Sequence, residues 1–377
     1  MLLSRRIITL TAVLGFIVVV SFFTVKYDGH VALESAARSL TGQEKKPAFS
    51  TIQNVVYNRT RVQEEAKFAY VQYTTDLDYL CNAMINFSRL KEFNTKHQLA
   101  LIYPDTWNSE GKSAVSARRF RIMNKIRTEY PHINLHPSPV LQLPNGDATW
   151  GASITKFHAF SLVDYTRVLA FDSDTLVLNN MDHYFEAPRA VLAVPRAYWL
   201  GDLRNTSLSI NEQILGSHVM LLEPNTRRHD RIVKDAMDSG EFDMEVVNRL
   251  FKGSAMILPH RGLALLTGEF RSKDHSRYLV GEGEDGEDGE QWDAVAEVKR
   301  SFLVHFSDWP LPKPWMFHTD RQWRDALPSC EEAEKEEERR RKRRGRGEDD
   351  CPDKLVWRGF YEEYDRERRA KCGFIDG

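Results

Sequence analysis

Short apolar runs alternate with segments of helical periodicity in the first half of the chain, and this pattern restricts the possible folds most. Residues 68–73 and 99–103 have the length and composition of buried strands, and helical spacing follows each of them. A third run, 167–171, ends directly at acidic residues. Alternating strands and helices indicate an α/β domain with a largely parallel sheet. We expect helices at 116–130 and 153–160, and later strands at 190–195, 219–222 and 302–306.

The N-terminal region has the features of a membrane anchor. Residues 7–25 form a run of 19 residues without a charge, about the length that crosses a bilayer. Arg5 and Arg6 precede it, so the positive-inside tendency places residues 1–6 in the cytosol and the rest in the lumen. The alternative is a cleaved signal peptide, whose apolar part is typically only about 7 to 15 residues and ends in a small-residue cleavage site. We therefore expect an uncleaved anchor and type II topology.

Changes in composition along residues 26–377 predict a stem, a globular domain, two charged segments and a C-terminal helix. Residues 26–66 are polar without a sustained period, which is typical of a stem, and the globular domain is expected at 67–327. An acidic insertion at 281–290 and a charged segment at 328–350 are expected to be solvated and to carry no catalytic group. Apolar residues at helical spacing in 351–377 predict a C-terminal helix that docks on the core.

Net charge and cysteines restrict the partners and the compartment. The formal net charge is −2, which argues against a nucleic-acid binder because no basic excess is available to neutralise phosphates. For an oxidising lumen we expect one disulfide among Cys330, Cys351 and Cys372, and a buried free thiol at Cys81. Three glycosylation sequons give weak further support for the lumen, at Asn58, Asn86 and Asn205.

The strongest local signal is Asp172-Ser173-Asp174, directly after an apolar strand. Residues two apart at a strand end turn their side chains to the same side, and ligands of open α/β sheets bind at the carboxyl ends of strands. Two converging carboxylates repel unless a cation neutralises them, and such oxygen ligands suit Mg²⁺ or Mn²⁺. The alternative is a solvated turn in which the aspartates accept local hydrogen bonds.

A second signal, His305 to Trp315, also follows an apolar run. His305 at a strand end offers a nitrogen ligand, which favours Mn²⁺ over Mg²⁺. Lys313 lies between prolines and could stand against a diphosphate as a fixed point charge. The alternatives are a buried, satisfied histidine, an ordinary solvated lysine, and core packing for Trp309 and Trp315.

Together these segments resemble the family 8 glycosyltransferases, the retaining nucleotide-sugar enzymes that include glycogenin, over roughly residues 68–315. The resemblance implies a GT-A type α/β fold, with Asp172, Asp174 and His305 holding Mn²⁺ (or Mg²⁺) and Lys313 gripping the diphosphate of a UDP-sugar. Lys156 matches the conserved lysine of the donor site. The positions that hold the uridine in this family are matched by Tyr73, Thr75, Asp76 and Tyr79.

The chain also departs from the family pattern. Gly216-Ser217-His218 stands where Asn-Ser-Gly is common, and Asp243-Met244-Glu245 stands where Asp-Gln-Gly is common. The spacing from His305 to Lys313 is two residues longer, with Asp308 at a position where glycine is usual. These departures imply that the acceptor side differs from that of glycogenin. With the anchor and the aromatic C-terminal helix, the chain is similar to a fungal Golgi subgroup of N-acetylglucosaminyltransferases.

We therefore expect a retaining enzyme of the Golgi membrane that moves a sugar, with N-acetylglucosamine the best candidate, from a UDP-sugar to a glycan acceptor. Asp243 is expected to orient the sugar or stabilise the reacting centre, with a helix N-cap as the alternative role. Two other functions stay open from the sequence. One is a non-catalytic lumenal protein that binds glycans, and the other is a metal-dependent hydrolase of nucleotide sugars.

Overall fold

The computed structural model describes residues 66–144, 151–200, 213–279, 291–330 and 351–376. They belong to one compact unit, Glu65–Gly377. The expected anchor at 7–25, nearly all of the stem, the acidic insertion at 281–290 and most of the charged segment at 328–350 lie outside these residues. Among the helices of the described part, none combines the length and the apolar character of a membrane span.

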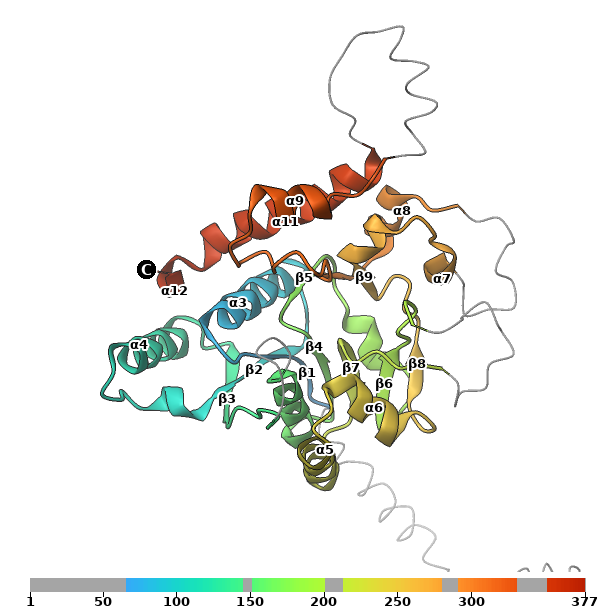
Figure 1. Ribbon diagram of the computed structural model, residues 1–377. Helices are drawn as coiled ribbons and strands as arrows, with labels where there is room; N and C mark the ends of the chain where they lie inside the picture. The colour runs from blue at the N-terminus through green and yellow to red at the C-terminus, as the bar shows by residue number, and fades with distance from the viewer. Residues whose placement is uncertain (1–65, 145–150, 201–212, 280–290, 331–350, 377) are drawn as a thin grey trace, which may run out of the picture. The chain divides into compact units, whose positions relative to one another are not determined.

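The main sheet has seven strands in the order β3-β2-β1-β4-β7-β6-β8 (Figure 1). The first four strands are parallel, and β4 and β6 each pair antiparallel with β7. Central strand β1 is paired on both sides, so that Val71 lies opposite Ala100 in β2 and Ala170 in β4. The predicted α/β fold with a largely parallel sheet is confirmed, with a mixed edge. The bounds are β1 Phe68–Tyr73, β2 Gln98–Pro104, β3 Ile133–Ser138, β4 Arg167–Phe171, β6 Leu192–Pro195, β7 Val219–Leu222 and β8 Met256–Leu258.

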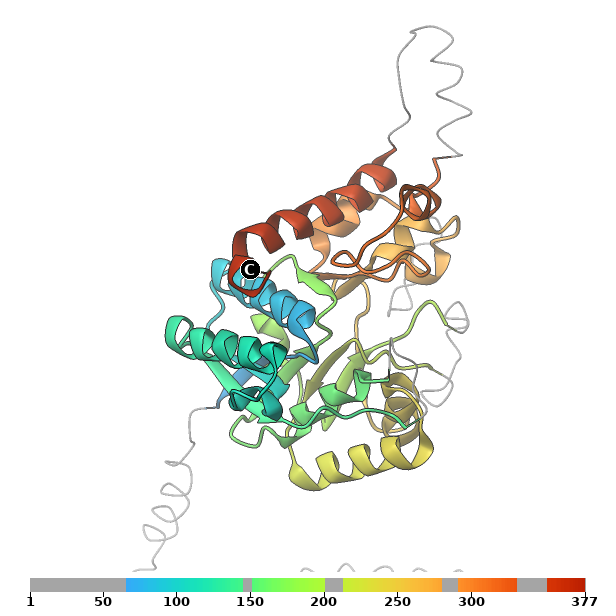
Figure 2. The same cartoon turned by 60° about the vertical axis from the view of Figure 1, so that its left-hand side comes forward.

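Helices cover both faces of this sheet because alternate strand residues point to opposite sides. Tyr70 contributes to the core under α3 (Leu77–Glu92), α4 (Ala114–Glu129) and the C-terminal helix. Its neighbour Val71 contributes to the other core, under η2, α5 and α6. Figures 1 and 2 show these two groups of helices on opposite sides of the strands. The bounds of the second group are η2 Ser153–Ser161, α5 Thr226–Ser239 and α6 Asp243–Phe251. The helix expected at 153–160 is present as the 3-10 helix η2.

A second, three-stranded sheet positions the site. β10 (Leu303–His305) pairs antiparallel with β5 (Thr175–Val177) and parallel with β9 (Ala264–Leu266). This register places His305 opposite Thr175, one residue beyond Asp174. The pairing therefore brings residues from distant parts of the chain to one point. The remaining helices are η1 Asp105–Asn108, η3 Asp182–Glu186, η4 Thr267–Arg271, α7 Ser276–Leu279, α8 Ala294–Arg300, α9 Asp320–Ala326 and α12 Gly373–Asp376.

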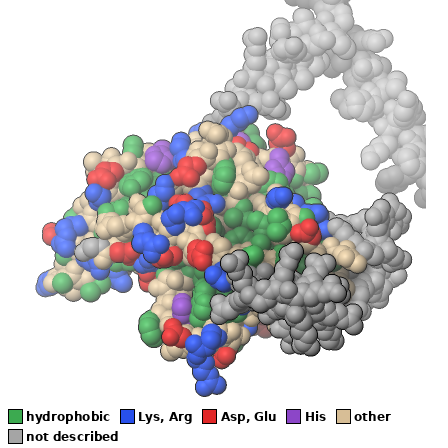
Figure 3. Space-filling view, turned by 90° about the horizontal axis from the view of Figure 1, so that it is seen from above, with side chains coloured by type: hydrophobic (Ala, Val, Ile, Leu, Met, Phe, Trp, Pro, Cys, Tyr) green, Lys and Arg blue, Asp and Glu red, His purple; other side chains and the backbone are tan. Residues whose placement is uncertain are grey.

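The C-terminal helix α11 (Pro352–Lys371) docks on the core, as predicted. Its apolar stripe is buried, with the exception of Leu355, which is 51% exposed. The hydroxyl of Tyr364 donates a hydrogen bond to Asn82 of α3 at 2.5 Å. Figure 2 shows α11 running over α3. On the face seen from above, where α11 lies, basic and acidic side chains are interspersed with apolar ones (Figure 3).

Two disulfides involve all four cysteines. Cys330 pairs with Cys351, which confirms one disulfide among the last three cysteines. Cys81 pairs with Cys372 over a sequence separation of 291, so the prediction of a free thiol is wrong. The burial of Cys81 in α3 was predicted from the apolar stretch around it, but which cysteine lies beside it, at the end of α11, depends on tertiary packing.

The sequon at Asn86 is not accessible. This side chain is fully buried in α3, where its amide donates to the Thr175 carbonyl at 3.0 Å and to Gln72 Oε1 at 3.3 Å. Its carbonyl accepts from the Val177 amide at 3.0 Å. The Asn86 side chain instead links α3 to Thr175 and Val177 at the start of the second sheet. Of the other sequons, Asn58 and Asn205 lie outside the described residues.

Candidate functional site

The turn between β4 and β5 aims both aspartates of the Asp-Ser-Asp motif at one place. Ser173 is fully buried, and its hydroxyl donates to the Tyr73 carbonyl at 2.5 Å. The Asp172 amide donates to the His218 carbonyl at 2.9 Å. The turn is thus attached to β1 and β7, and it is not the freely solvated turn that the sequence left open.

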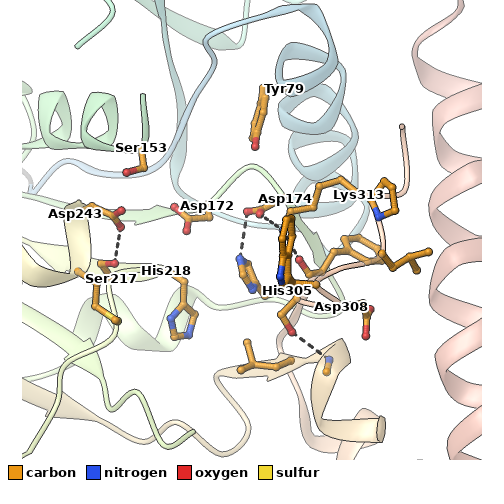
Figure 4. Close-up of a pocket in the computed structure, with 18 of the residues that line it drawn as sticks. Tyr79, Ser153, Asp172, Asp174, Ser217, His218, Asp243, His305, Asp308 and Lys313 are labelled. Atoms are coloured by element: carbon orange, nitrogen blue, oxygen red, sulfur yellow. Dashed lines mark hydrogen bonds and ion pairs between the residues drawn. The ribbon is translucent and has the colours of Figure 1, made fainter. Parts of the chain in front are cut away.

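Asp172, Asp174 and His305 form a group of potential metal ligands. One ligand atom from each residue lies within 4.8 Å of the others. His305 Nε2 is 3.3 Å from Asp174 Oδ1, and the backbone amide of Phe306 donates to the Asp174 carbonyl at 3.0 Å. Two carboxylates and one imidazole are a donor set that suits Mn²⁺. The residues therefore fit a divalent cation (Figure 4).

Two lysines balance the carboxylates. Lys156 of η2 is buried, and its Nζ lies 2.5 Å from Asp172 Oδ1 and 2.6 Å from Asp243 Oδ2. Burial opposes the charged form of Lys156, but the two carboxylates raise its pKa above its usual value. Lys313 Nζ lies 2.6 Å from Asp174 Oδ2. Each aspartate of the motif therefore has its own cationic partner.

The two aspartates differ in their electrostatics. Burial raises the pKa of Asp172 to about 6, against the opposing effect of Lys156, and Asp174 adds to the rise. Burial also acts on Asp174, but Lys313 and His305 hold its pKa well below its usual range. Without a bound cation, nearby positive charge therefore offsets the cost of burying the Asp172 carboxylate only in part, whereas it offsets that of the Asp174 carboxylate fully.

Asp243 belongs to the site and does not cap a helix. It is the first residue of α6, whose N-cap is Phe242 without a side-chain cap. Its Oδ2 accepts from Lys156 Nζ at 2.6 Å and from the Ser217 hydroxyl at 2.5 Å. Burial would raise the pKa of Asp243, but Lys156, Ser153 and Ser217 lower it to about 2. The alternative role as an N-cap is wrong, and the carboxylate stays ionised at neutral pH.

These groups line one cavity of about 800 Å³, which is within the usual range for ligand sites. The four residues expected to hold uridine, Tyr73, Thr75, Asp76 and Tyr79, line it as well. Asp76 is at the same time the N-cap of α3, where its side chain accepts from the Tyr79 amide at 2.9 Å. The Tyr79 ring meets Trp315 edge-on, with centroids 5.3 Å apart. Every site residue chosen from the sequence therefore faces this cavity.

The structure adds residues that the sequence reasoning did not assign to the site. Asp308 is buried in the cavity wall, and its Oδ2 accepts from the hydroxyl of Tyr361 at 2.8 Å. Arg271 Nη1 lies 3.6 Å from its other carboxylate oxygen. Tyr361 comes from α11, so the C-terminal helix completes the wall. Asp308 was visible as a departure from the family pattern, whereas Tyr361 carried no sequence signal beyond its place in an apolar stripe.

Comparisons with known proteins supplement this geometry. No protein-family model matches the chain. A protein of Gibberella zeae named glucose N-acetyltransferase 1 is 36% identical over 309 residues, which are 81% of this chain and 63% of the relative's length. The Aspergillus fumigatus protein of that name is 32% identical over 88% of this chain and 82% of its own length. Glycogenin-1 of Oryctolagus cuniculus is 25% identical over 46% of this chain and 47% of its own length.

Among solved structures, the galactosyltransferase LgtC in complex with donor and acceptor sugar analogues aligns with 71% of this chain and 99% of its own. The TM-score is 0.45 and the sequence identity is 14%.

Proposed function

The chain belongs to the fungal family whose members are named glucose N-acetyltransferase 1, and from this premise we propose that it transfers a sugar from a UDP-sugar to a glycan acceptor. It is a glycosyltransferase, and the predicted resemblance to glycogenin-like enzymes is confirmed by its relatives. The chain spans 63% of the length of the Gibberella relative. Donor, acceptor, metal and location are therefore argued from the site.

The observation that carries the proposal is the convergence of Asp172, Asp174 and His305 inside the large cavity. In this proposal the three residues hold Mn²⁺, or Mg²⁺ as the alternative. A divalent cation there would neutralise negative charge on a diphosphate as it leaves. Lys313 Nζ lies 2.6 Å from Asp174 Oδ2, so a small turn of the side chain would bring it to a phosphate oxygen of a diphosphate held at the aspartates.

Uridine is assigned to the end of the cavity near Tyr79. In Figure 4 this ring lies on one side of the aspartates, while Ser217 and Asp243 lie on the other. The nucleoside would lie against the aromatic rings of Tyr73 and Tyr79, which supply apolar surface for a base. A diphosphate at the aspartates then places the sugar near Asp243.

Asp243 has the role of orienting the sugar. It is held ionised and fixed by Lys156 and Ser217, so it can accept hydrogen bonds from sugar hydroxyls without changing its own position. Lys156 is a positioning residue that also keeps Asp172 and Asp243 from repelling one another. If the reaction is retaining, the departing phosphate is the base that receives the proton of the acceptor hydroxyl.

The proposed location is the Golgi membrane, with the compact unit in the lumen. Support comes from the uncharged run at 7–25 with its preceding arginines, and from two disulfides, which persist in oxidising compartments. Protease treatment of intact vesicles tests this. Digestion of the C-terminal helix without detergent would contradict the topology.

The central experiment uses the full chain in detergent with a panel of UDP-sugars, and it measures UDP release with and without a glycan acceptor. We expect release that depends on Mn²⁺ and on the acceptor. Asp172→Asn and Asp174→Asn keep side-chain shape and should lower turnover by about 100-fold or more, since each removes a charged ligand. Asp235→Asn is the control, because Asp235 forms an ion pair with Arg249 at 2.5 Å and does not line the cavity.

Three results distinguish the alternatives. Equal UDP release with and without acceptor indicates a hydrolase. Binding of glycan without any UDP release indicates a non-catalytic protein. Wild-type rates in both Asn variants would overturn the metal assignment.

A further inference from the structure

His218 forms part of the cavity wall and has no role in the proposal so far. It directly precedes β7, and its carbonyl holds the Asp172 amide at 2.9 Å. Its side chain lines the cavity and is only 7% exposed. The ring lies between Trp199 and His305, with centroid distances of 5.6 Å and 5.8 Å. The imidazole is therefore confined to one place between two other rings.

Gly216 creates the space for this ring. A Cβ atom at Gly216 would lie 2.9 Å from both Cε1 and Nδ1 of His218, closer than side-chain contacts allow. The same atom would be 3.4 Å from the Pro195 carbonyl, to which the Gly216 amide donates at 2.8 Å. Any larger residue at position 216 must displace the imidazole, because the backbone beneath it is fixed by β6.

The ring lies on the sugar side of the cavity. Figure 4 shows His218 across the aspartates from Tyr79, between His305 and the Ser217–Asp243 pair. Within the described residues, the group of converging ligand atoms contains Asp172, Asp174 and His305 but not His218. A diphosphate at the aspartates and a nucleoside at Tyr79 leave the donor's sugar as the part that reaches His218.

The chemistry of the ring suits recognition of hydroxyl or acetamido groups. The imidazole is buried in the cavity wall beside the rings of Trp199 and His305. A neutral imidazole offers one N–H donor and one nitrogen acceptor. A sugar whose substituents cannot pair with such a buried group leaves it unsatisfied, and this mismatch is a strong source of discrimination.

We propose that His218 determines donor specificity by contacting the ring substituents of the UDP-bound sugar, and that Gly216 leaves the space that this position of the ring requires. This inference rests on the proposed transfer from a UDP-sugar. It adds the substrate-selecting group to that site, and it assigns a function to the Gly-Ser-His sequence that distinguishes the chain from the family pattern.

The test compares four donors: UDP-N-acetylglucosamine, UDP-N-acetylgalactosamine, UDP-glucose and UDP-galactose. Values of kcat/KM are measured for the full chain and for His218→Gly, His218→Asn and Gly216→Ala. His218→Gly should change the ratio between the preferred donor and at least one other by about tenfold or more, mainly by slowing the preferred donor. Gly216→Ala should shift the same ratio in the same direction although the imidazole is retained. His218→Asn, which keeps a donor and an acceptor, should shift it less than His218→Gly.

His132→Gly is the matched control, because His132 is exposed between α4 and β3 and should leave all ratios unchanged. Thermal melting verifies that each variant is folded. The proposal is overturned if both His218→Gly and Gly216→Ala keep their donor ratios within about twofold of wild type. Such a change corresponds to under about half a kcal/mol. A second result would also overturn the proposal: the His218 variants need much more Mn²⁺ for half-maximal activity while their donor ratios stay unchanged. His218 would then act in cation binding and not in donor selection. Absence of activity with every UDP-sugar in the wild type refutes the proposed function itself.

Discussion

Replacing each aspartate of the Asp-Ser-Asp motif by asparagine should have opposite effects on the stability of the metal-free protein. From the sequence Asp172 and Asp174 look equivalent, but their surroundings differ. The pKa of Asp172 is raised on folding to about 6, whereas Lys313 and His305 hold the pKa of Asp174 well below its usual range. Asparagine keeps the shape of either side chain and removes only its charge.

The size of the effect follows from linkage between ionisation and folding. An aspartate with pKa 3.8 in the unfolded chain and about 6 in the folded protein destabilises the fold by about 3 kcal/mol above pH 6, because one pKa unit corresponds to about 1.4 kcal/mol. This penalty begins as the pH rises past 3.8 and is complete above about 6. Asp172→Asn removes it, which for a unit of this size raises the Tm by roughly 4 to 5 °C at pH 7.5.

Asp174→Asn should act in the other direction. Ionised Asp174 stabilises the fold fully above the unfolded pKa of 3.8, and this contribution is lost only as the pH falls through the folded pKa, which lies well below 3.8. The substitution leaves Lys313 without the carboxylate at 2.6 Å. Because both side chains keep some exposure, we expect a loss of at least about 1 kcal/mol and less than the value of about 3 to 5 for a fully buried pair.

The assay is thermal unfolding of the full chain in detergent, with chelator and then with Mn²⁺, at pH 7.5 and near pH 4. With chelator at pH 7.5 the Tm should rank Asp172→Asn above wild type and wild type above Asp174→Asn. Near pH 4 Asp172→Asn and wild type should nearly converge, whereas Asp174→Asn should stay below them, because the folded pKa of Asp174 lies well below 3.8. Mn²⁺ at 100 times its Kd should raise the wild-type stability by about 2.7 kcal/mol and the variants much less. Equal losses in both variants would refute the electrostatic reasoning, and equal gains from Mn²⁺ would refute the metal site.

Three further variants test other contacts. Replacing Cys81 and Cys372 by alanine should lower the free energy of unfolding by about 5.5 kcal/mol in the chain-entropy model, because the loop they close is so long. Denaturant titration measures this change, and a loss under about 1 kcal/mol contradicts the prediction. Lys156→Met leaves two buried carboxylates unpaired, so we expect a loss of about 3 kcal/mol or more with little UDP release. Tyr361→Phe removes the 2.8 Å hydrogen bond to buried Asp308 and should cost about 1.5 to 3 kcal/mol in thermal unfolding, whereas an unchanged Tm would mean that water replaces the hydroxyl.

Local patterns predicted the strands well because burial and length are properties of contiguous residues. The run ending at Phe171 is β4, and the aspartates after it emerge at its carboxyl end, as strand geometry requires. The helix expected from 116 begins two residues earlier, at Ala114, because the Ser113 side chain caps it. Such differences of one or two residues reflect capping chemistry that periodicity does not contain.

Contacts between distant segments of the chain were harder to predict from the sequence. His305 was linked to the aspartates through family resemblance, and only the antiparallel register of β10 and β5 explains why it meets Asp174. For Asp243 the local pattern permitted an N-cap, but α6 begins at this residue, and its carboxylate pairs with Lys156 of η2 instead. The position of Cys372 beside α3 likewise depends on where α11 packs.

The bond between Cys81 and Cys372 has a consequence for biosynthesis. Cys81 leaves the ribosome 291 residues before its partner, which at a rate of about 5 to 20 residues per second is a delay of roughly 15 to 60 seconds. Cys330 and Cys351 emerge during that interval and are chemically competent to capture the waiting thiol. Cys81 is fully buried in the folded unit, but Cys372 and helix α11, which are made last, are part of what covers it there. Correct oxidation thus requires the Cys81 thiol to stay unpaired until α11 has emerged and docked on α3.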